Sequence, residues 1–373
     1  MNFGLTEDQE HLRHSTRMFL DEQCPLPEVR RLIEENVGYS PKTWKSLASL
    51  GWSGLITDDT YGGAGLGWIE LIVLLEETGR SLFPSPLIST LLTSSFVNDI
   101  GSDQQKQAWL PRLADGTEIG TLALFDRPED IGPHGILTRG EVTDNTVVID
   151  GRKAHVLDAP DASVFVVAFK TDAGDLGVAL VPRDAAGVEV IALEALDQSK
   201  RVGHVTFSNV EVPQANVLGD ASQSWPAIAR VMDQGAVAMT AEMLGAGEAA
   251  LALTVQYAKD RTQFGSPIGR FQGVKHPLAE IHVELESTRS LLYYAAWALE
   301  ESPKAVPAAA SAAKAYATES FTRIGVDAIQ LHGAVGYTEE YDIQLYLKRS
   351  KFARPAYGDE DFHLERVATL GGL

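Results

Sequence analysis

Apolar residues in the first third of the chain recur every three or four positions, which is the spacing of helices buried on one face. This pattern predicts helices over Glu7–Phe19, Lys42–Leu50, Trp68–Arg80 and Gln104–Leu113. Thr6 and the pair Ser40-Pro41 are typical helix starts, and Gly51 is a typical stop. Residues 1 to 120 are therefore predicted to form an N-terminal helical domain.

Between residues 121 and 225 the pattern changes to short runs of β-branched and aromatic residues separated by turn residues. These runs predict strands over Ser163–Phe169, Gly177–Val181, Val188–Ala192 and His204–Phe207. Val147–Asp150 is predicted to be a strand that enters a turn at Gly151, and Val210–Pro213 to lead out of the domain. Short strands at this spacing predict a small β-sandwich or barrel.

From residue 226 to residue 373 the helical period returns in long segments. Ala238–Thr262, Phe271–Glu301 and Pro307–Leu331 are rich in good helix formers, with apolar residues at three- and four-residue steps. The order of helical segment, strands and helical bundle predicts an α+β protein with a C-terminal four-helix bundle.

The overall composition is that of a folded globular protein, with 45% hydrophobic and 22% charged residues. Cys24 is the single cysteine, so an intramolecular disulfide is impossible, which favours a reducing compartment. The N-terminal segment lacks the pattern of a secretory signal, and no apolar run has the length of a membrane span. We therefore expect a cytoplasmic protein.

The formal net charge of −20 excludes nucleic acids and anionic membranes as general partners, because such a field repels phosphates. A polyanionic cofactor would need a local pocket of basic side chains or backbone amides. The histidines show no metal-ligand spacing with carboxylates or with Cys24, so no metal is predicted.

Two segments of the helical bundle have residues suited to binding an anion. Arg261 precedes Phe264-Gly265 at the end of one predicted helix, and its guanidinium group suits phosphate oxygens. Gln330 and Gly333 end another helix, where glycines expose backbone amides. Taken singly, each segment is more typical of a plain turn between helices or of a glycine stop than of an anion site.

The joint pattern is more specific than either segment. Tyr61-Gly62-Gly63, Gly151-Arg152-Lys153, Val210-Glu211-Val212-Pro213, Arg261-x-x-Phe264-Gly265, Phe271-Gln272, His276 and Gln330-x-x-Gly333-x-x-Gly336 follow one another along the chain. In order and spacing this series resembles the acyl-CoA dehydrogenase family over essentially the whole sequence. The resemblance implies an N-terminal helical domain, a middle β domain and a C-terminal four-helix bundle.

The same resemblance implies the cofactor FAD, an acyl-CoA substrate and an electron-transferring flavoprotein as electron acceptor. It implies that part of the FAD is held by a neighbouring subunit, through residues that match Arg261, Phe264, Gln272, Gln330, Gly333 and Asp359. The second glycine of the family's Gln330 segment is replaced by Ala334. His276 matches a structural helix residue of the family, so we expect it in the core or an interface.

The family's catalytic base is where this chain departs from the resemblance. A carboxylate must remove the α-proton of the thioester while the β-hydrogen leaves as hydride to the flavin. The usual glutamate position falls on Tyr357, or on Gly358 if the tyrosines are aligned. The alternative position, on the first bundle helix, falls near Gly235, and Asp233 lies about 200° away on such a helix.

The segments that surround the flavin ring in the family are also altered. Asp126-Arg127-Pro128-Glu129-Asp130-Ile131 stands in place of the family's glycine-rich hydroxyl loop, and His155-Val156-Leu157-Asp158 in place of Trp-Ile-Thr-Asn. The segments that reach a neighbour's FAD are largely retained. The chain is therefore predicted to complete a partner's flavin site while its own catalytic pocket is incomplete.

Three functional hypotheses follow. The first is a subunit, without a base of its own, of a hetero-oligomeric acyl-CoA dehydrogenase with two copies of each chain, resembling actinobacterial enzymes that shorten steroid side chains. The second is an autonomous homo-oligomeric dehydrogenase that uses Glu360 or Asp359 as a displaced base, although Asp359-Glu360-Asp361 is also typical of a solvated turn. The third is a scaffold or CoA-thioester-binding protein without redox activity. His363 is a further acid–base candidate.

Overall fold

The computed structural model describes residues 4–372, which group by their contacts into two units. The first unit contains the described part of residues 1–31, residues 68–83 and the C-terminal segment from Asp233. The second contains residues 32–67 and 84–232. The helices of the N-terminal segment are thus divided between the two units. The predicted domain boundaries near residues 120 and 225 remain predictions.

The first helices begin where the sequence signals place them. α1 (Glu7–Gln23) starts with a capping box, in which Thr6 accepts from the amide of Gln9 and the Gln9 side chain accepts from the amide of Thr6. α3 (Pro41–Ser49) starts at Ser40, and α4 (Trp68–Arg80) has the predicted bounds. α6 (Asp103–Ala114) starts with a second capping box at Ser102.

Two helices of this part of the chain lie outside the predicted ranges. α5 (Leu87–Ile100) is buried on nearly all sides, so its sequence shows no contrast between an apolar and a polar face. α2 (Leu26–Glu34) is short and follows α1 after a brief break. Three-residue 3-10 turns cover Asp59–Tyr61, Pro133–Gly135, Gln214–Asn216 and Ile268–Arg270, and a five-residue one covers Gly333–Tyr337.

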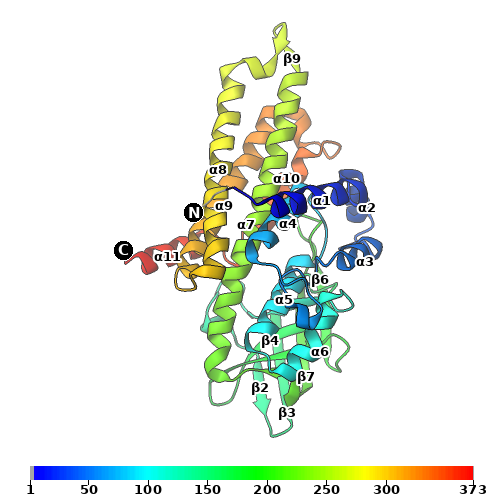
Figure 1. The fold of residues 1–373 in the computed structure, drawn as a ribbon, viewed down its shortest axis with the longest axis vertical. Coiled ribbons are helices and arrows are strands. Elements are labelled where there is room, and N and C mark those ends of the chain that lie inside the picture. Colours follow the sequence, from blue (N-terminus) through cyan, green and yellow to red (C-terminus); the bar gives the residue numbers. More distant parts are fainter. Residues whose placement is uncertain (1–3, 373) are drawn as a thin grey trace. The chain divides into compact units, whose positions relative to one another are not determined.

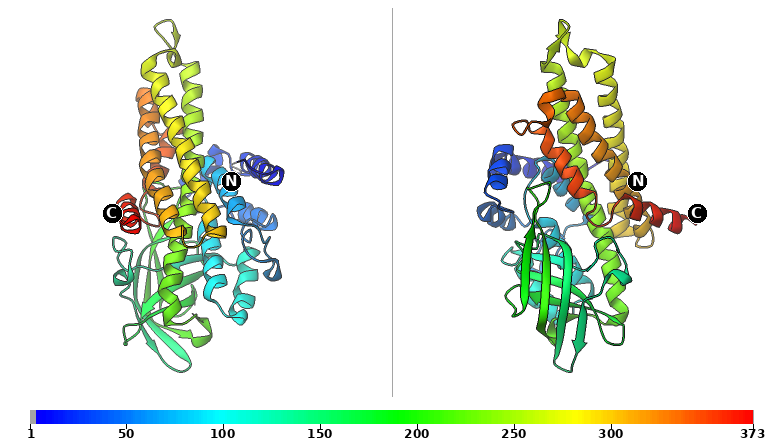
Figure 2. Two further views of the ribbon diagram at one scale, coloured as in Figure 1. Left: turned by 60° about the vertical axis from the view of Figure 1, so that its left-hand side comes forward. Right: turned by 180° about the vertical axis from the view of Figure 1, so that it is seen from behind.

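The second unit contains one eight-stranded sheet (Figure 2). Its strand order is β6-β7-β3-β2-β4-β5-β8, with β1 pairing in parallel with β4. The strands are β1 (Gly120–Ala123), β2 (Arg139–Val142), β3 (Thr146–Leu157), β4 (Val164–Lys170), β5 (Leu176–Pro182), β6 (Val188–Leu193), β7 (Val202–Pro213) and β8 (Val217–Leu218). β2 meets β4 through the single pair Arg139 and Lys170, which joins two groups of strands.

The predicted turn at Gly151 is wrong. β3 continues through this residue to Leu157 and pairs with β7, with a register shift between Ile149 and Gly151. Gly151 has φ 154°, and a Cβ there would lie 2.5 Å from the hydroxyl oxygen of Thr138. The glycine therefore marks a bulge within a long strand and not its end. β7 likewise runs without a break to Pro213.

The bundle of the first unit is built from α7 (Ala221–Asp260), α8 (Gln272–Glu301), α9 (Val306–His332) and α10 (Ile343–Ala353), and α11 (Glu360–Gly371) packs on α9. α7 and α8 are joined by the hairpin of β9 (Thr262–Gln263) and β10 (Ser266–Pro267), as Figure 1 shows. α7 begins well before the predicted Ala238. The predicted fold class, α+β with a C-terminal bundle, is confirmed.

α4 and α7 cross with their backbones in contact. A Cβ on Gly79 would lie 2.1 Å from the backbone oxygen of Glu242, and one on Gly245 would lie 1.8 Å from that of Glu76. Only glycine permits so close an approach. This crossing brings the backbone of Glu76 on α4 against Gly245 of α7.

α7 is long and apolar enough to cross a membrane by length and composition alone. Within its apolar window, 78% of the residues are buried inside the protein. A helix whose apolar residues are already covered by protein is typical of a bundle core.

Candidate flavin and acyl-thioester site

The loop between α10 and α11 contains Tyr357, at the position where the family resemblance places the catalytic base. Tyr357 and Gly358 have φ angles of 59° and 103°, so both lie in the left-handed region. Tyr357 is 9% exposed, and its ring therefore faces the protein interior. A bulky residue in this region of φ is strained and persists only when its surroundings hold it there.

The Tyr357 ring fills the space beside Gly235 on α7. A Cβ built on Gly235 would lie 2.3 Å from Cδ1 and 2.6 Å from Cε1 of this ring. The two alternative base positions, far apart in the sequence, therefore meet at one place in the bundle. That place is occupied by an aromatic ring and holds no carboxylate from either position.

Two buried side chains hold the same loop from inside the bundle. Nζ of Lys314 donates to the backbone oxygens of Arg354 and Gly358, at 2.9 Å each. Nε2 of His363 lies 3.0 Å from the backbone oxygen of Tyr357. His363 is thus a buried residue of the bundle.

Asp359 and Glu360 begin α11. The Asp359 side chain accepts a hydrogen bond from the amide of Phe362 at 2.9 Å and is the N-cap of this helix. Glu360 is the first helical residue, 3.8 Å from the Arg354 guanidinium group. Both carboxylates therefore have structural partners. The two residues proposed as a displaced catalytic base form the start of a helix.

Asp233 is the buried carboxylate nearest in sequence to Gly235. Its Oδ1 accepts from Nη1 of Arg366 at 2.6 Å, and the guanidinium group of Arg366 lies over the ring of Phe362 at 5.4 Å. Burial raises the pKa of Asp233, and the hydrogen bond and charge of Arg366 oppose that rise. The carboxylate is therefore committed to an ion pair with α11.

The hairpin at the end of α7 exposes the residues that match the family's dinucleotide contacts. Phe264 and Gly265 form its tip with φ angles of 53° and 75°, as a tight two-residue hairpin turn requires. Phe264 is 93% exposed, and Arg261 and Gln272 are exposed beside it. An exposed arginine and an aromatic ring presented together suit an anionic ligand with flat rings.

The segment with Gln330 and Gly333 lies at the same end of the bundle. Gly333 ends α9 with φ 67°, and a Cβ there would meet no atom within 4 Å, so the surface around it is open. The preceding His332 stacks on Tyr257 of α7 with ring centroids 4.4 Å apart, and the Tyr257 hydroxyl donates to the His332 backbone oxygen. Tyr257 is one helical turn before Arg261, which brings the two segments together.

His332 also has a buried Nε2 without a hydrogen-bond partner, while its Nδ1 contacts the backbone oxygen of Ala328 at 2.7 Å. Burial lowers the pKa of this imidazole. With an exposed arginine and an open glycine terminus, this end of the bundle fits the phosphate and adenosine end of FAD. When bound, FAD supplies the hydride acceptor of the reaction.

His276 is exposed on α8, so its predicted place in the core is wrong; a place in an interface remains a prediction. Among residues 4–372, no group of three histidine, cysteine or acidic side chains is arranged to hold a metal ion.

In the sheet unit, the side chain of Asp126 makes hydrogen bonds to residues of the same unit. Its carboxylate accepts from the amide of Leu137 at 2.8 Å, the hydroxyl of Thr138 at 2.6 Å and Nζ of Lys153 at 2.7 Å. Lys153 is fully buried, and burial lowers its pKa to about 8 despite the charge of Asp126. His155 has φ 49° and packs against His204 with ring centroids 5.3 Å apart.

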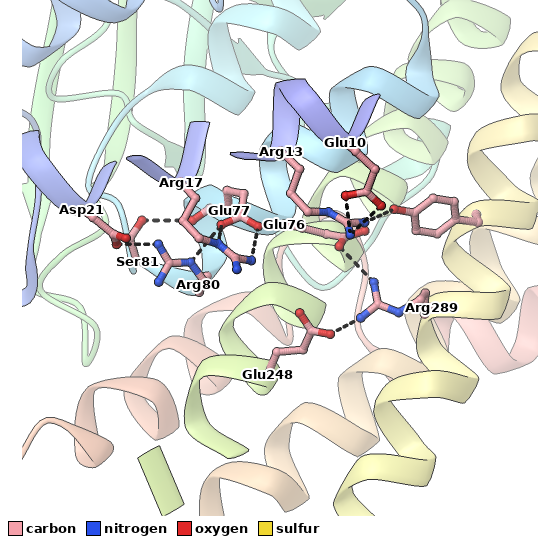
Figure 3. A network of polar contacts seen from close by, with 11 residues as sticks. Glu10, Arg13, Arg17, Asp21, Glu76, Glu77, Arg80, Ser81, Glu248 and Arg289 are labelled. Atoms are coloured by element: carbon pink, nitrogen blue, oxygen red, sulfur yellow. Dashed lines mark hydrogen bonds and ion pairs between the residues drawn. The ribbon is translucent and has the colours of Figure 1, made fainter. Parts of the chain in front are cut away.

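The bundle unit contains a polar network that the sequence analysis does not predict (Figure 3). Part of this network lines a pocket of about 550 Å³ between α1, α4, α7 and α8. Arg289 donates to Glu76 at 3.0 Å and pairs with Glu248, and Arg17 pairs with Glu77 at 2.6 Å. Burial raises the pKa of Glu76 to about 7, opposed by Arg289. The available signal was the pair Glu76-Glu77 within an otherwise apolar helix.

The order of helices, sheet and bundle, with an exposed basic hairpin, is that of a flavin-binding dehydrogenase. The family "Acyl-CoA dehydrogenase, N-terminal domain" matches residues 6–117, and "Acyl-CoA dehydrogenase, C-terminal domain" matches residues 223–370. The chain therefore belongs to the acyl-CoA dehydrogenase family, whose members are flavin-dependent oxidoreductases. The predicted family and the cofactor FAD are confirmed.

Relatives match the chain along its whole length. Acyl-CoA dehydrogenase IpdE2 of Mycolicibacterium smegmatis is 29% identical, covering 97% of this chain and 98% of its own. Probable acyl-CoA dehydrogenase YngJ of Bacillus subtilis is 28% identical, covering 97% of each chain.

Several solved structures of this family have the same fold as the chain. Butyryl-CoA dehydrogenase from Megasphaera elsdenii has a TM-score of 0.94 at 25% identity, covering all of both chains. A chain of the ChsE4-ChsE5 complex from Mycobacterium tuberculosis has a TM-score of 0.91 at 26% identity and covers 100% of this chain and 99% of its own. A chain of a variant of the steroid ACAD Tcur3481-Tcur3483 has a TM-score of 0.88 at 29% identity, covering 98% of each.

Proposed function

We propose that this chain is the subunit without a catalytic base in a hetero-oligomeric, FAD-dependent acyl-CoA dehydrogenase. The observation that carries the proposal is the contact between Tyr357 and Gly235. An α-proton can be removed only by a group within hydrogen-bonding distance of it, at a suitable pKa. An aromatic ring stands where either family position would supply that carboxylate.

The exposed end of the bundle gives the chain its part in the complex. Arg261, Phe264 and Gln330 are presented outward, and the hairpin that carries the first two projects beyond α7 and α8 (Figure 1). In the proposed complex these residues hold the phosphate and adenosine end of an FAD whose flavin ring lies in the partner. The partner supplies the base and the surroundings of the flavin ring.

The substrate is proposed to be a CoA thioester with a bulky acyl group, such as a steroid side chain. Two of the similar structures support this, because they are named as paired chains and one of them as a steroid ACAD. We propose two copies of each chain in the complex, an electron-transferring flavoprotein as electron acceptor, and the cytoplasm as location.

The autonomous enzyme that would use Glu360 or Asp359 is the less favoured alternative. Asp359 already accepts the hydrogen bond that caps α11, and Glu360 lies beside Arg354. The scaffold without redox activity is disfavoured by family membership and by the exposed dinucleotide residues.

The test compares the isolated chain with its complex. The chain is expressed alone and together with a partner of the same family that has a glutamate at the position of Tyr357, and turnover of an acyl-CoA is followed with an artificial electron acceptor. We expect turnover and a flavin spectrum only in the complex. Removal of the partner's glutamate should abolish turnover, whereas Glu360→Gln and Asp359→Asn in this chain should not. Full turnover by the isolated chain, lost in Glu360→Gln, contradicts the proposal.

A further inference from the structure

Lys314 is a fully buried amine in the middle of α9. Nζ donates to Oγ1 of Thr318 at 3.2 Å and to the backbone oxygens of Arg354 and Gly358 at 2.9 Å. None of these acceptors is a carboxylate. An ammonium group has three N–H donors and a neutral amine has two, so three acceptors match the charged form.

His363 approaches the same loop from α11. Its Nε2 lies 3.0 Å from the backbone oxygen of Tyr357, which can only accept, so Nε2 carries the proton. Its Nδ1 lies 3.2 Å from the hydroxyl of Ser311 on α9 and accepts from it. Burial, with the nearby charge of Lys314, lowers the pKa of His363 to about 3, which keeps the imidazole neutral.

These contacts hold three carbonyl groups of one short loop, those of Arg354, Tyr357 and Gly358. The loop includes two consecutive residues with left-handed φ, a conformation that a chain keeps only when its surroundings enforce it. We infer that Lys314 is the positioning residue that, with His363, fixes this loop so that the Tyr357 ring stays against Gly235.

The consequence for function rests on the proposed role of the chain: Lys314 keeps this chain's own acyl site closed. The inference that Lys314 fixes the loop does not depend on the proposed function, because it concerns only contacts between the loop and the bundle. Three titratable or charged groups face Lys314, namely Arg354, Asp359 and His363. Burial lowers the pKa of Lys314 to about 7, Asp359 raises it and Arg354 lowers it further.

Hydrogen-exchange mass spectrometry of the full chain tests the inference. In Lys314→Met, peptides covering residues 355–363 should exchange about ten-fold faster or more, because both loop carbonyls lose their donor. Peptides from α8 should be unchanged. The amides that report the change are those of Gly358, Phe362 and His363, which are hydrogen-bonded within the loop and the first turn of α11.

Thr318→Val is the matched control. It removes one acceptor of Lys314 but neither loop carbonyl, so exchange of residues 355–363 should stay within two-fold of the wild type. Unchanged loop exchange in a folded Lys314→Met protein, or an equal increase in Thr318→Val, overturns the inference. Either result leaves the proposed function intact, because that function is read from turnover of the complex.

If Lys314→Met does not fold, His363→Leu provides the test. This variant removes the donor to the Tyr357 carbonyl and leaves the contacts of Lys314 in place. Exchange of residues 355–363 should rise by about two-fold or more while that of α8 stays constant. Unchanged loop exchange in the folded variant overturns the inference.

Discussion

The ring of Tyr357 lies so close to Gly235 that a single added methyl group on the glycine would overlap Cδ1, at 2.3 Å. The position is helical and interior, where alanine would otherwise be favoured over glycine. We therefore expect Gly235→Ala to lower the free energy of unfolding by about 1–3 kcal/mol through overpacking. Urea denaturation followed by circular dichroism measures it.

The double variant isolates the cause. Removing the ring with Tyr357→Ala should remove the clash, so Gly235→Ala should cost less than about 0.5 kcal/mol in that background. Gly273→Ala is the control, because a Cβ there meets nothing within 4 Å in the first turn of α8. Equal costs of Gly235→Ala with and without the Tyr357 ring would contradict the contact.

Patterns within one element were readable from the sequence, and contacts between elements were not. Trp68–Arg80 was bounded correctly because its apolar period and its flanking residues agree. The turn at Gly151 was wrong because a glycine at a bulge and a glycine at a turn look alike in a sequence. α5 gave no signal because a helix buried on all sides has no polar face.

The same distinction applies to the candidate site, where local motifs could be predicted and contacts between elements could not. The exposed residues Arg261 and Phe264 were found from a local motif, and the absence of a carboxylate at position 357 was equally visible. That Tyr357 packs on Gly235 could not be predicted, because it depends on the crossing of a loop and a helix more than 100 residues apart. The role of Lys314, in an alanine-rich helix, could not be predicted either, because it also depends on contacts with a loop distant in the sequence.

Asp359 is expected to matter for stability and not for catalysis. Asp359→Ala removes the N-cap of α11 and should lower the free energy of unfolding by about 1 kcal/mol. Asp359→Asn keeps a capping oxygen and should be nearly neutral. Asp361→Ala, in the first turn but not at the cap, is the control. Turnover lost in a stable Asp359→Asn complex that still binds FAD would instead identify this residue as the base.

The pKa of Glu76 predicts a pH dependence of stability. Burial raises it from 4.5 to about 7 in the folded state, so between these values the folded chain binds more protons than the unfolded chain. Its contribution to the free energy of unfolding should therefore fall as pH rises from about 4.5 to 7, by at most about 3 kcal/mol. The measurement is the difference between wild type and Glu76→Gln in urea midpoint at each pH.

That difference should change most steeply between about pH 4.5 and 7 and should level off below and above this window. Glu286→Gln serves as the control, since Glu286 also faces Arg289, at 3.6 Å, but its side chain is 53% exposed. A wild-type stability that rises relative to Glu76→Gln over this window would show that the charged form of Glu76 is favoured by its ion pair with Arg289.

Arg261 is expected to act on flavin held by the complex and not on the fold of its own chain. Its side chain is exposed beside the hairpin tip, so Arg261→Ala should change the free energy of unfolding by less than about 0.5 kcal/mol. Loss of a charge-assisted hydrogen bond to a phosphate should weaken FAD binding by roughly 10- to 100-fold. Arg270→Ala is the matched control, because Arg270 is also exposed, in the turn Ile268–Arg270 that follows the hairpin, but is not among the residues predicted to contact FAD. Flavin fluorescence of the reconstituted complex measures the dissociation constant. Equal affinities for the two variants would show that the hairpin does not hold the dinucleotide, whereas a selective loss in Arg261→Ala would assign this end of the bundle to FAD.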